Sequence, residues 1–207
     1  MDTSTELKND RFQLVDLVVD KILAIIEHPR EKEIITRRFG LGTKKETLEQ
    51  IGERLDITRE RVRQLEKAAL IRLKIEAEKG KIDHLSEIEK ILIRNLAEAE
   101  RIDRTKNIVR KILGEDKNEK YTTNFIFIAE VSSKLVLLSE NDKYHSSIAN
   151  AEYGDERKIK KSIDEIVNII KKQKSPVTLE YLDNQLDYEH PSQINAIASI
   201  SKLLATL

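Results

Sequence analysis

The sequence predicts an all-α protein made of tandem three-helix units, with at most one short β-hairpin. The first observation is composition: 39% of residues are hydrophobic, 36% are charged and only 4% are aromatic, a mixture typical of amphipathic helices. The second is that apolar residues recur at helical spacing along most of the chain. The third is that the prolines and most glycines fall between these periodic segments, where they end helices.

Charge and cysteine content exclude several classes of protein. Lys plus Arg and Asp plus Glu each number 37, so the formal net charge is zero and only local charge can indicate a nucleic-acid partner. The absence of Cys excludes disulfides, a thiol nucleophile and Cys-based zinc sites. The first thirty residues show no signal-peptide pattern, and apolar runs such as Leu135–Leu138 are far shorter than a membrane span. We therefore expect a soluble, cytoplasmic protein without membrane contact.

The first two helices are expected in the first forty residues. Residues 12–27 carry a broad apolar face at helical spacing. Pro29 ends this helix, because a residue that precedes proline avoids the helical region. A second, short helix is expected over Arg30–Arg38, and it ends at a turn that contains Gly40 and Gly42.

The next two helices have the start signals of a helix-turn-helix. Thr47 and Gln50 fit a capping box, which places a helix start at Thr47. After a tight turn at Asp56 and Ile57, Thr58 is expected to cap a long helix that runs to about Glu78. Two helices joined by such a short turn are typical of DNA-binding helix-turn-helix units.

Two further units are expected beyond Gly80. Helices are predicted over residues 85–101, 105–113 and 123–131, followed by a hairpin of residues 134–139 and 143–149. Three helices and a hairpin follow the order of a winged helix, and irregular strands and loop are the alternative. Three more helices, over residues 155–172, 178–186 and 192–207, repeat the order without a wing, as expected of a chain truncated at Leu207. The predicted domains are 1–79, 80–152 and 153–207.

The helix that follows Thr58 carries the strongest functional signal. Val62, Leu65 and Ala69 share one face at i, i+3, i+7 spacing and should face the core. The exposed stripe contains Arg59, Glu60, Arg63, Gln64 and Lys67. Arg, Gln and Glu can read guanine, adenine and cytosine edges, and six basic against two acidic residues between positions 58 and 74 favour phosphate contact. The alternative is a solvated helix face with internal ion pairs.

Residues Arg30 to Lys74 closely resemble region four of the sigma-70 family. The matching segments are RRFGL, TLEQIG and TRERVRQLE, in order and with the family's spacing. The resemblance implies a domain that reads the −35 promoter element and docks on the flap of the RNA polymerase β subunit. It implies base contacts by Arg59, Glu60 and Gln64. It implies DNA-backbone contacts by Arg30, Arg38, Thr47, Leu48, Arg61, Arg63 and Lys67.

The chain also departs from that family. A complete sigma factor has an upstream region two, whose aromatic residues melt promoter DNA, whereas 29 residues precede Arg30 here and Phe12 is their one aromatic. We therefore expect no promoter opening with core polymerase alone. The residues after Lys74 resemble the tandem winged-helix modules of some sigma-like helix-turn-helix proteins.

No pattern indicates catalysis. The four histidines, His28, His84, His145 and His190, lack metal-ligand spacing, and there is no phosphate-binding loop or nucleophile motif. We expect no enzyme activity, cofactor, metal or small-molecule substrate. Residues 144–147 on the predicted hairpin are expected to be either an exposed turn or a DNA-contacting wing. Two functions stay open: a sequence-specific transcription factor that acts with RNA polymerase on promoter DNA, or a protein-interaction module that docks on the polymerase or a sigma factor.

Overall fold

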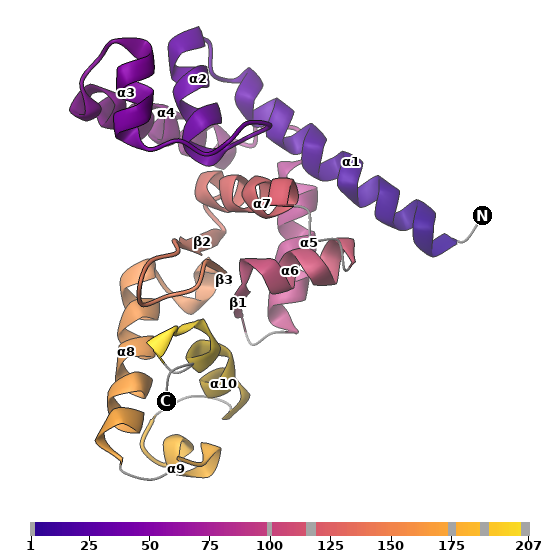
Figure 1. Cartoon of the computed structure of the whole chain (residues 1–207). Coiled ribbons are helices and arrows are strands. Elements are labelled where there is room, and N and C mark those ends of the chain that lie inside the picture. Colours follow the sequence, from indigo (N-terminus) through magenta and orange to yellow (C-terminus); the bar gives the residue numbers. More distant parts are fainter. Residues whose placement is uncertain (1–2, 99–100, 115–118, 174–176, 187–190, 204–207) are drawn as a thin grey trace.

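The computed structural model describes residues 3–98, 101–114, 119–173, 177–186 and 191–203, and it confirms the predicted all-α class (Figure 1). The N-terminal helices are α1 (Thr3–Ala24), α2 (Pro29–Phe39), α3 (Leu48–Leu55) and α4 (Arg59–Glu78). Next come α5 (Leu85–Ala97), β1 (Ile102–Arg104), α6 (Thr105–Leu113), α7 (Glu119–Val131), β2 (Leu135–Leu138) and β3 (Ser147–Asn150). The last elements are the 3₁₀ helix η1 (Ala151–Tyr153), α8 (Glu156–Lys172), α9 (Leu179–Asp183) and α10 (Pro191–Ile200).

A small antiparallel sheet lies in the middle of the molecule. Its strand order is β1-β3-β2, and Ala149 of β3 faces Ile102 on one side and Val136 on the other. The predicted pairing of the two hairpin strands, β2 and β3, is therefore confirmed, but the second strand begins at Ser147 instead of residue 143. Strand β1 was not predicted, because three residues are too few to show strand alternation. The helix expected over 85–101 ends at Ala97 instead.

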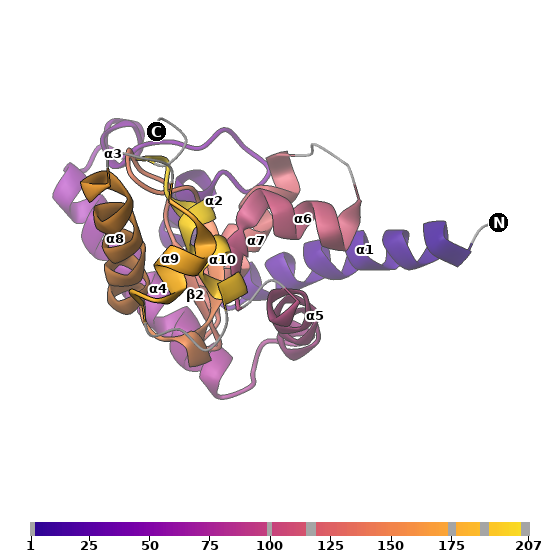
Figure 2. The same ribbon diagram turned by 90° about the horizontal axis from the view of Figure 1, so that it is seen from below.

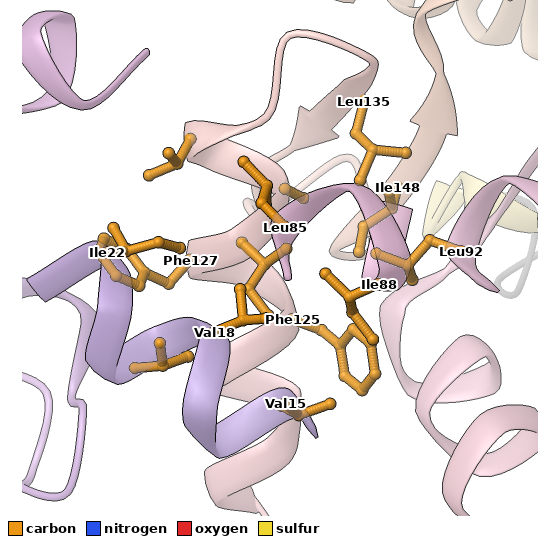
Figure 3. Packing of buried hydrophobic residues seen from close by; sticks show 14 of the residues in the cluster. Val15, Val18, Ile22, Leu85, Ile88, Leu92, Phe125, Phe127, Leu135 and Ile148 are labelled. Atoms are coloured by element: carbon orange, nitrogen blue, oxygen red, sulfur yellow. The ribbon is translucent and has the colours of Figure 1, made fainter. Parts of the chain in front are cut away.

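One hydrophobic core crosses the expected boundary at Gly80. It joins α1, α2 and α4 to α5, α6 and α7, and Figure 3 shows residues from both sides of Gly80 packed together. Phe127 of α7 is fully buried in this core, and its ring lies 5.0 Å from that of Phe39 at the end of α2. The side chain of Asp16 on α1 also accepts hydrogen bonds from Lys120 and Asn124 of α7. The cores thus do not follow the division into residues 1–79 and 80–152.

A second core lies on the other side of the sheet. Ile102, Leu138 and Ala149 from the strands pack there against Ile163 of α8 and Ile197 of α10. The expected unit of residues 153–207 therefore shares its core with the sheet. The last helix, expected over 192–207, ends at Ile200, and residues 204–207 lie outside the described part.

The last residues of the loop between β2 and β3 pack against the C-terminal helices, while residues 139–143 are exposed. Tyr144 is buried, its hydroxyl donates to Asp164 at 2.8 Å, and it forms a β-bridge with Ser201. The backbone N–H of His145 donates to the carbonyl of Ile200 at 2.9 Å. The expected exposed turn is wrong at Tyr144 and Ser147, which are buried, while His145 and Ser146 are half-buried. DNA contact by this loop stays a prediction.

The described helices include none that is both long and apolar enough to cross a membrane. In the view from below, α1 projects away from the body of the molecule, while α3, α4 and α8 gather on the opposite side (Figure 2).

Candidate nucleic-acid interface

Helices α3 and α4 form the predicted helix-turn-helix, and side-chain caps fix where each begins. At α3 the capping box is complete: Thr47 Oγ1 accepts from the Gln50 N–H at 3.2 Å, and the Thr47 N–H donates to Gln50 Oε1 at 2.9 Å. At α4, Thr58 Oγ1 accepts from the Arg61 N–H at 3.2 Å. Each cap satisfies backbone donors that the first helical turn leaves free, so both predicted starts are confirmed.

The turn between the two helices depends on Gly52, a residue that the sequence did not single out. Asp56 adopts a left-handed conformation with φ 54°, and the N–H groups of Asp56 and Ile57 both donate to the Gly52 carbonyl. A Cβ atom at position 52 would lie 2.7 Å from the Ile57 carbonyl oxygen. This backbone contact brings α4 close to α3, and only glycine fits it.

We expect Gly52→Ala to lower the free energy of unfolding by about 1–3 kcal/mol, because the added methyl group must push the turn away from α3. Urea denaturation measures this change. Glu53→Ala, which truncates an exposed side chain on the same helix, is the control and should change stability by less than about 0.5 kcal/mol. Equal effects of the two substitutions would show that the close approach at Gly52 is relaxed easily.

A local hydrophobic core fixes which face of α4 points inward. Ile34 of α2, Ile51 of α3 and Val62 of α4 are fully buried against one another, with the half-buried Leu65 packed beside them. Further along, Ala69 is buried in the main core. The predicted inward face of α4 is confirmed, and the opposite face must therefore point to solvent.

The outward face of α4 carries the three residues expected to read bases. Arg59, Glu60 and Gln64 are all exposed, and so is Arg63. Glu60 accepts two hydrogen bonds from Arg63, at 2.8 and 2.7 Å, and lies 3.4 Å from the Gln64 amide nitrogen. Arg59 lies 3.9 Å from Glu49 of α3, a long ion pair that leaves its side chain 69% exposed. The alternative of internal ion pairs thus applies to Glu60 and Arg63, and much less to Arg59.

The Glu60–Arg63 pair shifts both groups toward their charged forms. Hydrogen bonds from Arg63 hold the pKa of Glu60 below its ordinary value, and the same bonds raise the pKa of Arg63. Glu60 therefore remains a carboxylate, an acceptor for a cytosine amino group, at neutral pH.

The residues expected to contact the DNA backbone are less uniform. Arg30, Thr47, Arg61 and Lys67 are exposed, and Leu48 is half-buried against the local core. Arg38 is half-buried and tied inside the unit: its guanidinium donates to Glu66 at 3.1 Å and to the Glu46 carbonyl at 2.9 Å. Arg38 thus links α2 to α4 in this structure.

Carboxylates from other elements face α4, so its excess of positive charge is smaller than the sequence suggests. Glu31 of α2 pairs with Arg72, and Glu130 of α7 lies 3.0 Å from Lys74. Within the described residues, no ion pair reaches Arg61 or Lys67. Among the basic residues of α4, these two are therefore the most available for phosphate.

Glu46 joins three segments of the unit, and the sequence did not identify it. Its carboxylate accepts from Arg37 of α2 at 2.8 Å and from Arg54 of α3 at 3.2 Å. Hydrogen bonding from Arg54 and Arg37 lowers the pKa of Glu46 from its ordinary 4.5. This carboxylate anchors the loop between α2 and α3 to both helices.

The lowered pKa gives Glu46 a pH-dependent contribution to stability. Because its folded pKa lies below its unfolded pKa, the contribution is complete above the unfolded value and is lost as the pH falls through the folded value. Glu46→Gln should therefore be less stable than the wild type at about pH 7, and the difference should shrink toward about pH 3. Urea denaturation at several pH values measures this, with Glu53→Gln as the control. A difference that stayed constant over that range would contradict the role of the Glu46 carboxylate.

The side chains of helix α7 are largely buried in the main core. Tyr121, Asn124, Phe125 and Phe127 are buried, and α7 packs against α1 and α4. Helix α4 is therefore more accessible to a nucleic-acid partner than α7.

Comparison with known proteins identifies the same segment. Residues 28–74 match the family Sigma-70, region 4. The RNA polymerase sigma factor RpoD of Helicobacter pylori is 39% identical over 70 residues, which cover 33% of this chain and 10% of that protein. The chloroplastic RNA polymerase sigma factor sigF of Arabidopsis thaliana is 46% identical over 63 residues, covering 30% of this chain and 11% of that protein.

The family match covers residues 28–74, and the two relatives align with 33% and 30% of the chain. The chain spans about a tenth of the length of these curated relatives. No solved structure matches the chain. The capped helix-turn-helix, its outward arginines and the family match together show that residues 28–74 form a sigma-70 region 4 domain.

Proposed function

We propose that this protein binds promoter DNA in a sequence-specific manner through α4 and acts with RNA polymerase in transcription initiation. The observation that carries the proposal is the outward face of α4, where Arg59, Glu60 and Gln64 lie exposed near the start of the helix. In helix-turn-helix proteins the first residues of the second helix contact base edges in the major groove. The DNA element is a −35-like sequence, by analogy with the sigma factors that match this segment.

Phosphate contacts position the domain in this proposal. Arg61 and Lys67 are exposed cations, and Thr47 and Leu48 place the first N–H groups of α3 at its exposed end. Helix N-termini and basic side chains both bind phosphate without reading sequence. Arg63 can join them by exchanging its Glu60 partner for a phosphate.

A gel shift with a duplex that contains a −35 element tests the proposal, with and without core RNA polymerase. We expect binding to the duplex that a scrambled duplex does not compete away, and a larger complex when the polymerase is added. Binding that a scrambled duplex removes equally well would refute sequence-specific recognition.

A second candidate is a protein-interaction module that docks on RNA polymerase, for example on its β flap, or on a sigma factor. Ile71 and Ile75, one turn apart on α4, are 48% and 42% exposed, so two large apolar side chains lie near each other at the surface. In that case Ile71→Ser should abolish the polymerase-dependent shift and leave binding to DNA alone unchanged. Loss of DNA binding in the same variant would argue against a separate docking surface.

A further inference from the structure

The first two turns of α8 carry a group of basic side chains that the proposed DNA contacts of α3 and α4 do not involve. This α8 basic cluster consists of Arg157, Lys158, Lys160 and Lys161, of which all but the half-buried Lys160 are exposed. The two acids that precede it are engaged: the side chain of Asp155 accepts from the Lys158 N–H at 2.8 Å, and Glu156 pairs with Lys160 at 2.7 Å. Three exposed cations remain on this part of the helix.

Contacts within the protein engage these three cations only weakly. Lys161 lies 3.8 Å from Glu165, Lys158 stacks over the Tyr153 ring at 5.3 Å, and no ion pair in the described part of the chain involves Arg157. Helix electrostatics disfavour cations near a helix start and favour them near its end. The other basic pair of α8, Lys171 and Lys172, lies at that favourable end. The cluster therefore occupies a position that helix stability does not explain.

The cluster and α4 lie on the same side of the molecule. In Figure 1, α8 lies below α4 with α7 and β2 between them, and the start of α8 is the end that points toward α4. Lys74 of α4 contacts Glu130 near the end of α7, and the chain continues from there into β2, which packs against α8. A ligand that runs along this side from α4 would next meet the α8 basic cluster.

We propose that the α8 basic cluster is a second contact surface for the phosphate backbone of the duplex that α4 binds; this inference rests on the proposed function. Duplex DNA carries one charge per ~1.7 Å of its axis and stays straight over ~150 bp, so a duplex held at α4 continues past the site as a charged rod. Flexible Lys and Arg side chains bind such a rod without reading sequence. The cluster thus extends the footprint of the protein beyond the base pairs that α4 reads.

Salt titrations with two duplexes test this surface. Both contain one site selected by the wild-type chain from a random library; the short duplex spans about one helical turn and the long duplex extends it by about two turns on each side. The variant is Arg157→Gln/Lys161→Gln. Lys171→Gln/Lys172→Gln is the matched control, because it removes the same charge from the far end of the same helix. Circular dichroism and thermal unfolding confirm that both variants are folded.

On the long duplex we expect the Arg157→Gln/Lys161→Gln variant to lose about two units of the slope of log Kobs against log salt, while the control keeps the wild-type slope. On the short duplex all three proteins should share one slope. Identical slopes for variant and control on the long duplex would overturn the second contact surface while leaving the proposed function intact. Failure of the wild type to select any site would overturn both.

Discussion

Phe127→Ala should lower the free energy of unfolding by about 3–5 kcal/mol, the range for removing a fully buried aromatic side chain. Phe127 is 0% exposed, lies against Phe39 and sits beside Ile22 of α1 (Figure 3). It therefore connects α7 to α1 and to α2, the first helix of the sigma-70 region 4 domain. The cost includes both the lost burial and the cavity that remains between these helices.

Urea denaturation monitored by circular dichroism measures this effect. Ile126→Ala is the matched control, because Ile126 lies on the same helix but is half-buried and outside the core clusters. We expect its cost to be clearly smaller. A loss below about 1 kcal/mol for Phe127→Ala would show that the first two units do not depend on their shared core.

Arg59→Ala should relax sequence preference at one or two base pairs, at a cost of about 1–3 kcal/mol of discrimination. Arg59 lies at the first position of α4, its side chain is 69% exposed, and its nearest carboxylate is 3.9 Å away. It is therefore free to reach a guanine edge. Binding to a set of duplexes that differ at single positions measures the loss base pair by base pair.

Lys67→Ala is the comparison for Arg59→Ala, because Lys67 is an exposed cation two turns further along the same helix. Its loss should weaken binding to all duplexes alike and lower the salt slope by about one unit. Indistinguishable profiles for the two variants would mean that α4 is an electrostatic anchor, and the interaction-module function would then be favoured.

Local signals in the sequence predicted most of the helices. Capping residues such as Thr47 and Thr58 act within one turn, so their effect is visible in a short window, and both predicted helix starts were confirmed. The core that crosses Gly80 was not predictable in this way, since a glycine ends a helix whether or not the flanking units pack together. The burial of Tyr144 likewise depends on α8 and α10, which follow it in the chain.

The candidate site was predicted to a similar extent. Helical spacing alone placed Val62 inward and Arg59 outward, and both placements are confirmed. Counting charges along α4 overestimated its positive excess, because Glu31 and Glu130 approach from other helices. The need for glycine at position 52 comes from the close approach of the Ile57 carbonyl oxygen, five residues away. Helical spacing does not describe the turn between these residues, so the sequence did not identify Gly52.

Selection from a randomised duplex library by the folded wild-type chain tests most directly whether α4 reads DNA sequence. We predict that one short motif is enriched, and that Arg59→Ala/Gln64→Ala removes the enrichment while the variant keeps the wild-type thermal stability. Recovery of random sequence by the wild type, or of the same motif by the variant, would contradict sequence reading by α4.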